Sequence, residues 1–164
     1  MNSHPFSTLS LENGAQLIFT PCPGTKEASL ADSVLTLKKA GTDMLLTLMF
    51  DEEIKKNNAD SLANVCAQHD IDWLQLPILD DAAPTEAFET QWQAHKSAII
   101  DVINSKGTIA VHCKGGAGRT GLVIGLILLS LGWSHDKAIK EVQKIRPVAL
   151  KKAQQLTYFN AYRA

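Results

Sequence analysis

Short apolar stretches alternate with longer helical patterns along this chain, and no other feature of the sequence limits the fold as much. The apolar stretches have the length of strands and cover residues 16–20, 44–49, 73–76 and 108–112. Strands that are separated by helices of roughly ten or more residues are joined by crossovers into a parallel sheet. We therefore expect an α/β fold with a short, mostly parallel sheet and helices on both faces.

The helical patterns place apolar residues three and four positions apart, as one buried helix face requires. We expect helices over residues 30–40, 60–69, 85–103, 119–131, 134–145 and 151–162. In the third of these, Phe88, Trp92 and Ile99 form a stripe that we interpret as core. A length of 164 residues, with 45% hydrophobic and 20% charged residues, is typical of a soluble domain. The chain is expected to form a single domain over residues 1–164.

Charge is unevenly distributed along the chain, although the net charge is only −1. Residues 1–100 contain six Lys and Arg against fourteen Asp and Glu, whereas residues 101–164 contain ten against three. A net charge near zero argues against a general polyanion binder, so we expect no nucleic acid partner. The basic C-terminal part would suit an anionic substrate, although ordinary solvated helix faces explain the same counts.

Three cysteines occur without a C-x-x-C motif, so neither a thioredoxin-like motif nor a cysteine-rich zinc site is expected. The first ten residues lack the basic and apolar regions of a signal peptide. The most apolar run, residues 121–133, is shorter than the ~20 residues that span a bilayer, so we interpret it as a buried helix. We expect a cytoplasmic monomer that does not insert into membranes.

The segment VHCKGGAGRT, residues 111–120, lies between an expected strand and an expected helix. Gly115, Gly116 and Gly118 let the backbone curl tightly and turn its amide groups inward. The helix that begins near Gly118 adds the positive end of its dipole. In parallel sheets, ligands bind at the carboxyl ends of the strands, where this loop begins. These features predict an anion-binding cradle.

Cys113 lies at the base of the predicted cradle, and Arg119 follows six residues later. A lone buried cysteine is usually an inert hydrophobic residue. A helix N-terminus and nearby cations, however, stabilise a thiolate, which is a ready nucleophile at neutral pH. The guanidinium of Arg119 presents two N–H donors that match two phosphoryl oxygens. The combination predicts nucleophilic chemistry on a phosphate group.

The pattern Cys113-x₅-Arg119-Thr120, preceded by His112, resembles the signature loop of the cysteine-dependent protein-tyrosine phosphatases. The short chain is similar to their dual-specificity subgroup. HCKGGAGRTGLVIGLILLSL is similar to the kinase-associated phosphatase group, that of the cyclin-dependent-kinase inhibitors. The resemblance extends from about residue 18 onward and implies the fold of these phosphatases. Three further segments carry it: CPGTK at 22–26, PILDDAAP at 77–84 and RPVALKKAQQ at 146–155.

The resemblance implies hydrolysis of a phosphate monoester in two steps, with a phosphocysteine formed on Cys113. Arg119 would stabilise charge on the transferred phosphoryl group, and Thr120 would ease departure of the thiolate. His112 would hold the cysteine backbone and tune its acidity. Because Arg119 and backbone amides do the electrostatic work, neither a metal nor a cofactor is expected. The residues expected to bind the phosphate are Lys114, Gly115, Gly116, Ala117, Gly118 and Arg119.

The same resemblance implies a general acid on a mobile loop after another strand. Asp80 matches the family position, and its neighbour Asp81 stays an alternative. The acid would protonate the leaving group and later act as a base on the attacking water. Gln155 matches the glutamine that family members place near this water, with Gln154 as the alternative. Arg146 is similar to an arginine that lies beside the signature loop.

These inferences predict a phosphatase for phosphotyrosine, and also for phosphoserine and phosphothreonine, in a phosphorylated protein substrate. Lys114 departs from the protein phosphatases and resembles the basic loops of phosphoinositide phosphatases, although Ala117 lacks the further basic residue of those loops. A phosphatase for phosphoinositides or another non-protein phosphate monoester is therefore an alternative. A non-catalytic phosphate-binding module and a sulfur transferase with a persulfide on Cys113 are alternatives from other classes.

Four residues each have two interpretations. Lys26 is a surface lysine or, through its place in CPGTK, a residue that lines the site. Lys114 is likewise a solvated rim charge or a substrate contact. Cys22 and Cys66 are inert thiols or, as this enzyme class allows, disulfide partners for Cys113.

Overall fold

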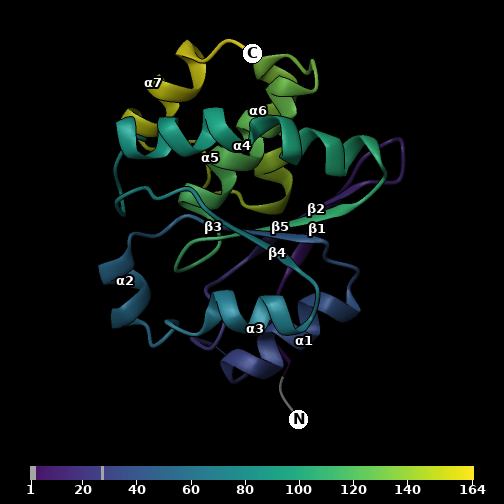
Figure 1. Cartoon of the computed structure of the whole chain (residues 1–164). Helices are drawn as coiled ribbons and strands as arrows, with labels where there is room; N and C mark the ends of the chain where they lie inside the picture. The colour runs from purple at the N-terminus through teal and green to yellow at the C-terminus, as the bar shows by residue number, and fades with distance from the viewer. Residues whose placement is uncertain (1–2, 27) are drawn as a thin grey trace.

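The computed structural model describes residues 3–26 and 28–164, and these residues contain a five-stranded sheet between two layers of helices (Figure 1). The strands lie in the order β1-β2-β5-β3-β4, and among them β1 alone runs antiparallel to its neighbour. The expected α/β fold with a mostly parallel sheet is confirmed. The strands are β1 (Ser7–Ser10), β2 (Gln16–Thr20), β3 (Met44–Thr47), β4 (Asp72–Gln75) and β5 (Thr108–His112).

The described residues also form seven helices, which are divided between the two faces of the sheet (Figure 1). They are α1 (Leu30–Lys39), α2 (Asp51–Lys56), α3 (Leu62–Gln68), α4 (Glu86–Asn104), α5 (Gly118–Ser130), α6 (His135–Ile145) and α7 (Ala153–Ala161). Helices α1 and α3 cover one face, and α4 to α7 cover the other. The six expected helices are all present, with ends that differ by at most two residues.

Alternating side chains of the inner strands build two cores, one on each face of the sheet. Leu17 and Phe19 of β2 pack into the core that contains α5. Ile18, between them, packs into the second core with Val34 and Leu37 of α1. Every residue of β3 and of β5 is buried, because helices cover both faces of these strands. The sheet therefore provides a rigid support for the loops that follow its strands.

Helix α5 is buried over nearly its whole surface, which explains why its sequence lacks a polar face. The interpretation of the apolar run at 121–133 as a buried helix is confirmed. Gly121 packs against α6 and the segment after it, and a β-carbon there would lie 2.4 Å from Cβ of Ala149. In the described part of the chain, no helix combines the length and apolarity needed to cross a membrane.

The carboxyl ends of three parallel strands meet at one edge of the sheet. In the strand register, His112 of β5 lies beside Thr20 of β2 and Thr47 of β3. The loop after β5 and the segments after β2, β3 and β4 therefore start close together. This juxtaposition gathers residues that are far apart in the sequence.

Two elements were not expected from the sequence. Strand β1 has four residues with a weak burial pattern, and it forms by pairing with β2 across a tight turn at Gly14. Helix α2 has six residues, too few for a helical period to be recognised. Strand β3 ends at Thr47 rather than at Met49, because the chain leaves the sheet to begin α2.

Candidate active site

Residues 113–117 join β5 to α5 and form the loop that was expected to bind an anion. Gly116 has φ +79°, and a β-carbon on it would lie 2.5 Å from the carbonyl carbon of Thr20, so only glycine fits. Neighbouring segments hold the loop from outside. Cys22 N donates to the carbonyl of Lys114 at 3.0 Å, and Arg146 Nε donates to the carbonyl of Gly116 at 2.9 Å.

Cys113 is nearly buried, with 3% of its surface exposed, at the bottom of a pocket of about 350 Å³. Its Sγ accepts hydrogen bonds from the amide of Gly116 and from Oγ1 of Thr120, each at 3.2 Å. The loop and the first turn of α5 thus each direct one donor at this sulfur. The amides of Gly115 and Ala117 donate to no residue that the structure describes, so they are free to bind an anion.

Arg119 is 2% exposed and is held firmly on one side. Its Nη1 and Nη2 donate to Oε1 and Oε2 of Glu53 at 2.7 and 2.8 Å, and Nη1 also donates to the carbonyl of Ile78 at 3.0 Å. Burial disfavours the charged guanidinium, but its hydrogen bonds to Glu53 and the charges of Cys113, Glu53 and Asp80 together outweigh burial, so the pKa of Arg119 lies above its ordinary value. Within the described residues, Nε has no hydrogen-bond partner.

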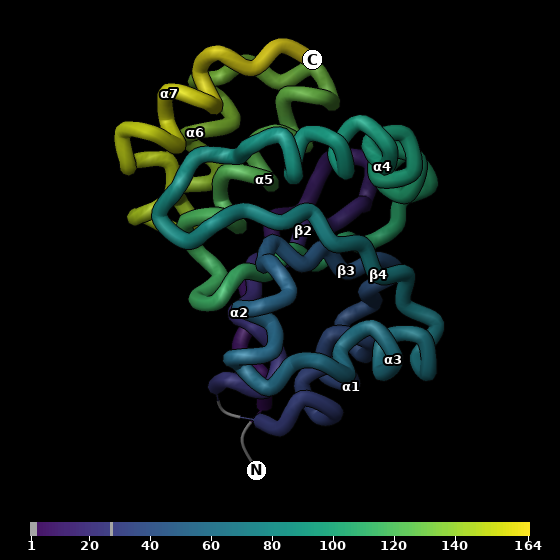
Figure 2. Tube along the Cα trace, turned by 60° about the vertical axis from the view of Figure 1, so that its left-hand side comes forward, coloured from purple at the N-terminus to yellow at the C-terminus, as the bar shows by residue number. Residues whose placement is uncertain are grey.

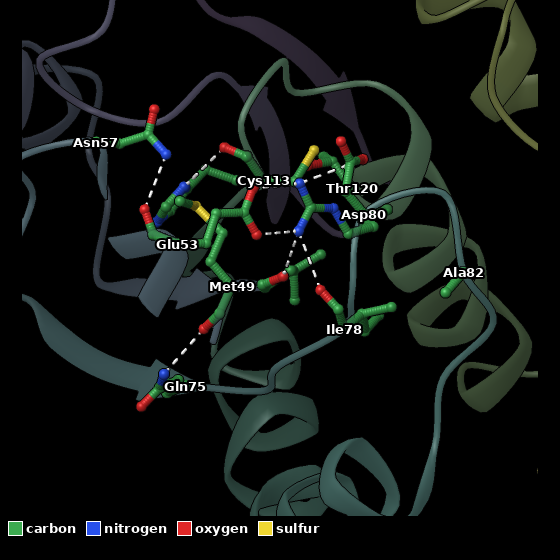
Figure 3. A network of polar contacts seen from close by, with 12 residues as sticks. Met49, Glu53, Asn57, Gln75, Ile78, Asp80, Ala82, Cys113 and Thr120 are labelled. Atoms are coloured by element: carbon green, nitrogen blue, oxygen red, sulfur yellow. Dashed lines mark hydrogen bonds and ion pairs between the residues drawn. The ribbon is translucent and has the colours of Figure 1, made fainter. Parts of the chain in front are cut away.

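The two neighbouring aspartates on the loop before α4 point to different partners. Oδ1 of Asp80 lies 3.4 Å from Nη2 of Arg119, so its carboxylate reaches the pocket floor. Figure 3 shows Glu53, Asp80 and Cys113 converging from three separate elements. Asp81 instead forms an ion pair with Lys152, just before α7. The carboxylate of Asp80 therefore lies beside Arg119, and that of Asp81 lies beside Lys152.

The start of α7 places two glutamines against this loop. Nε2 of Gln154 donates to the carbonyl of Asp81 at 2.5 Å, and Nε2 of Gln155 donates to the carbonyl of Ala82 at 3.3 Å. Gln155 is buried, and its Oε1 faces the signature loop, 3.8 Å from where a side chain of Gly118 would begin. Gln154 is exposed. The structure thus places Gln155, and not Gln154, in the pocket wall beside the loop.

His112 is fully buried beneath the loop, at the end of a chain of hydrogen bonds from β4. Nε1 of Trp73 donates to Oγ1 of Thr47 at 2.8 Å, which leaves the Thr47 hydroxyl hydrogen for Nε2 of His112 at 2.7 Å. Nδ1 of His112 then carries the ring proton and donates to the carbonyl of Cys113 at 3.0 Å. Burial lowers the pKa of His112 to about 4, so the ring is neutral near pH 7. The ring holds the cysteine backbone.

Three lysines lie around the pocket mouth: Lys26, Lys114 and Lys152. Lys26 therefore lines the site, as its place in CPGTK suggested. Lys114 and Lys26 are exposed. Together with Arg119, these lysines give the pocket a cationic rim.

The other cysteines are free thiols, as Cys113 is. Cys22 is buried behind the signature loop, and burial together with the charges of Glu53 and Cys113 raises its pKa to about 12. Burial likewise raises the pKa of Cys66 to about 12. Both thiols are therefore protonated and unreactive near neutral pH.

The sequence analysis missed four residues of this site, which are Glu53, Thr47, Trp73 and Lys152. A signal existed for Glu53, because three consecutive acidic residues follow β3 at the same edge of the sheet as Cys113. Thr47, Trp73 and Lys152 carry no motif. Their roles depend on strand register and on contacts across the fold.

Comparisons with known proteins agree with this geometry. The family described as "Polymorphic toxin system, DSP-PTPase phosphatase" matches residues 22–133. Protein tyrosine phosphatase type IVA 3 of Mus musculus is 30% identical over 127 residues, covering 70% of each chain.

Among solved structures, kinase-associated phosphatase with its catalytic cysteine replaced by serine has a TM-score of 0.84 at 22% identity, covering 97% of this chain and 93% of that one. PTPMT1 in complex with PI(5)P has a TM-score of 0.65 at 18% identity, covering 87% and 86%. These likenesses show the shared fold. With the family match and the identity to the mouse enzyme, they show that the chain belongs to the DSP-PTPase family of phosphatases, hydrolases of the protein-tyrosine and dual-specificity type.

Proposed function

We propose that this protein hydrolyses phosphotyrosine, and also phosphoserine and phosphothreonine, in proteins through a phosphocysteine on Cys113. One observation carries the proposal. Cys113, Arg119, Gly115 and Ala117 line one pocket, and among the described residues neither Nε of Arg119 nor the amides of Gly115 and Ala117 have a hydrogen-bond partner. A sulfur nucleophile surrounded by unused N–H donors suits a phosphoryl group, whose three non-bridging oxygens accept those hydrogen bonds.

In the first step, the thiolate of Cys113 attacks phosphorus, an S–P bond forms, and the P–O bond to the leaving group breaks. The leaving oxygen takes a proton from Asp80, whose carboxyl group reaches the pocket from the loop before α4. Arg119 and the loop amides stabilise the charge on the phosphoryl oxygens. Asp80 ends this step as a carboxylate.

In the second step, water attacks the phosphocysteine, and Asp80 takes a proton from that water. Gln155 lies in the pocket wall beside the loop, where its free Oε1 orients the water. The S–P bond breaks, and Thr120 donates a hydrogen bond to the departing thiolate through the contact that it already makes. Inorganic phosphate then leaves.

A second candidate substrate class is favoured by the lysines at the pocket mouth. Lys26, Lys114 and Lys152 would attract a monoester that carries further negative charge, such as a phosphoinositide headgroup. PTPMT1, which shares the fold, has been captured with PI(5)P.

Phosphate release tests the proposal when phosphotyrosine peptides, phosphothreonine peptides and phosphoinositide micelles are compared in parallel. We expect the wild type to prefer phosphotyrosine, Cys113→Ser to be inactive, and Cys66→Ala to retain activity as a matched cysteine control. Acid quenching during turnover should reveal one added phosphoryl group on the peptide that contains Cys113.

A large preference for the lipid would favour the second candidate. Binding of phosphate without release from any ester would show a binding module instead. Thiocyanate formation from thiosulfate and cyanide would point to sulfur transfer.

A further inference from the structure

We propose that Lys152 is a positioning residue that holds the loop bearing Asp80 in its catalytic place. The inference rests on the proposed function, in which Asp80 is the general acid. It concerns what keeps that acid over the pocket. The relevant contacts run between residues 79–82 and the start of α7, which lie side by side in Figure 2.

The loop makes a tight turn that its own residues do not favour. The amide of Ala82 donates to the carbonyl of Leu79 at 3.2 Å, which closes the turn. Asp81 occupies the third position with φ +59°, a left-handed conformation that suits glycine best and that aspartate adopts at a cost. A contact from another element can offset that cost.

Burial does not supply the contact, because the turn lies at the surface. The side chains of Asp80 and Asp81 are 66% and 64% exposed, and Leu79 is 60% exposed. Apolar packing therefore contributes little to the turn's conformation. Polar contacts from another element must define where Asp80 lies.

Three residues at the start of α7 supply these contacts. Lys152 forms an ion pair with Oδ1 of Asp81, Gln154 donates to the carbonyl of Asp81, and Gln155 donates to the carbonyl of Ala82. The backbone of Lys152 is held at the N-terminal cap of α7, because its carbonyl accepts from the amide of Leu156 at 2.9 Å. The ion pair thus ties the strained residue next to Asp80 to a helix end.

The ion pair predicts a specific kinetic signature. Without Lys152 the turn would visit other conformations, and Asp80 would protonate the leaving group less often. A monoester with a poor leaving group depends on that proton, whereas a nitrophenyl phosphate departs with little help. The loss should therefore appear in kcat/KM, which reports the first step, and be larger for phenyl phosphate than for nitrophenyl phosphate.

The experiment compares Lys152→Gln, Asp81→Asn and the double variant with wild type on both esters. Asparagine tolerates the left-handed conformation but cannot pair with Lys152. We expect each single variant to lower kcat/KM on phenyl phosphate about 3- to 5-fold, the range that an exposed ion pair can account for. The double variant should be no slower than either single one, because both remove the same contact. Lys151→Gln, an exposed neighbour with the same change in charge, should match wild type.

Two outcomes would overturn this inference alone. If Lys152→Gln lowers kcat/KM by the same factor for both esters, then Lys152 binds substrate and does not position the acid. If the effects of Lys152→Gln and Asp81→Asn multiply in the double variant, the pair does not act as one unit. Asp80→Asn is measured beside them. If Asp80→Asn leaves the ratio of kcat/KM between the two esters unchanged, Asp80 is not the general acid. This inference then fails together with that assignment.

Discussion

Glu53 holds the guanidinium of Arg119 by two parallel hydrogen bonds, from Nη1 to Oε1 at 2.7 Å and from Nη2 to Oε2 at 2.8 Å. The pair fixes the plane of the guanidinium and uses the terminal nitrogens. Nε is left as the donor without a partner among the described residues. Glu53 therefore fixes which edge of Arg119 is available to a phosphoryl oxygen.

Replacing Glu53 with Gln should loosen this arrangement, because an amide nitrogen cannot accept from the guanidinium. Hydrogen bonds between charged groups contribute about 1.5–3 kcal/mol, so we expect kcat/KM on an aryl phosphate to fall roughly 10- to 100-fold. Glu52→Gln, an exposed neighbour on the same helix, is the control and should retain activity. Equal activity of the two variants would contradict a role for Glu53 in orienting Arg119.

Asp80→Asn should reduce kcat on phenyl phosphate by roughly 10²–10⁴-fold, the usual contribution of a general acid. The decrease should be smaller for nitrophenyl phosphate, and the acid-dependent limb of the pH profile should disappear. Asp81→Asn, on the same turn, is the comparison and should show only a loss of about 3- to 5-fold, as expected from its ion pair with Lys152. If Asp81→Asn caused the large loss and Asp80→Asn did not, the acid would be Asp81, despite its ion pair with Lys152.

The hydrogen bonds that lead from Trp73 to Cys113 predict an effect on stability. Thr47→Val has nearly the same shape but removes the hydroxyl, so Nε2 of buried His112 and Nε1 of Trp73 both lose their partner. Leaving a buried polar group unsatisfied costs about 1–3 kcal/mol of unfolding free energy. Urea unfolding should show this loss. Thr42→Val, whose buried hydroxyl has no partner within the described residues, should cost less or even stabilise the fold.

Two buried histidines predict how stability depends on pH. Burial lowers the pKa of His4 and of His112 from 6.5 to about 4. The unfolded chain takes up these protons near pH 6.5, whereas the folded chain stays neutral until about pH 4. Protonation therefore favours unfolding, so unfolding free energy should fall as pH drops from about 6.5 to 4 and level off below.

Urea unfolding between pH 4 and 7.5 measures this slope. The contribution of fully buried His112 should be about 3 kcal/mol across the window. His4→Gln should remove part of this dependence of unfolding free energy on pH. His69→Gln, which replaces a half-buried histidine, is the comparison. Identical slopes for wild type and His4→Gln would show that His4 is not neutral in the folded chain at pH 5.

The sequence predicted the parts of this site that lie close together along the chain. The loop from Cys113 to Arg119 is local, so glycine spacing and the strand–helix junction sufficed to locate it. Choosing between Asp80 and Asp81, or between Gln154 and Gln155, required the backbone conformation. A left-handed residue at position 81 turns the two carboxylates apart. Glu53 and Thr47 reach the site only through strand order, which no local pattern carries.

The hydrogen bonds of Arg146 indicate how far the signature loop depends on contacts with neighbouring elements. Its Nε donates to the carbonyl of Gly116, its Nη1 to Oγ of Ser7 and its Nη2 to the carbonyl of Phe19. The planar guanidinium thus joins the loop to β1 and β2. Lysine keeps the charge but has one nitrogen, so Arg146→Lys cannot satisfy three separate acceptors.

We expect Arg146→Lys to weaken inhibition by inorganic phosphate about 10-fold and to lower unfolding free energy by roughly 1–2 kcal/mol, since a hydrogen bond contributes about 1 kcal/mol. Competitive inhibition of aryl phosphate hydrolysis measures the first effect and urea unfolding the second. Arg163→Lys, at the exposed C-terminal end, is the matched control. Unchanged phosphate inhibition in Arg146→Lys would mean that the loop keeps its amides inward without this arginine, through Gly116 and the hydrogen bond from Cys22 to Lys114 alone.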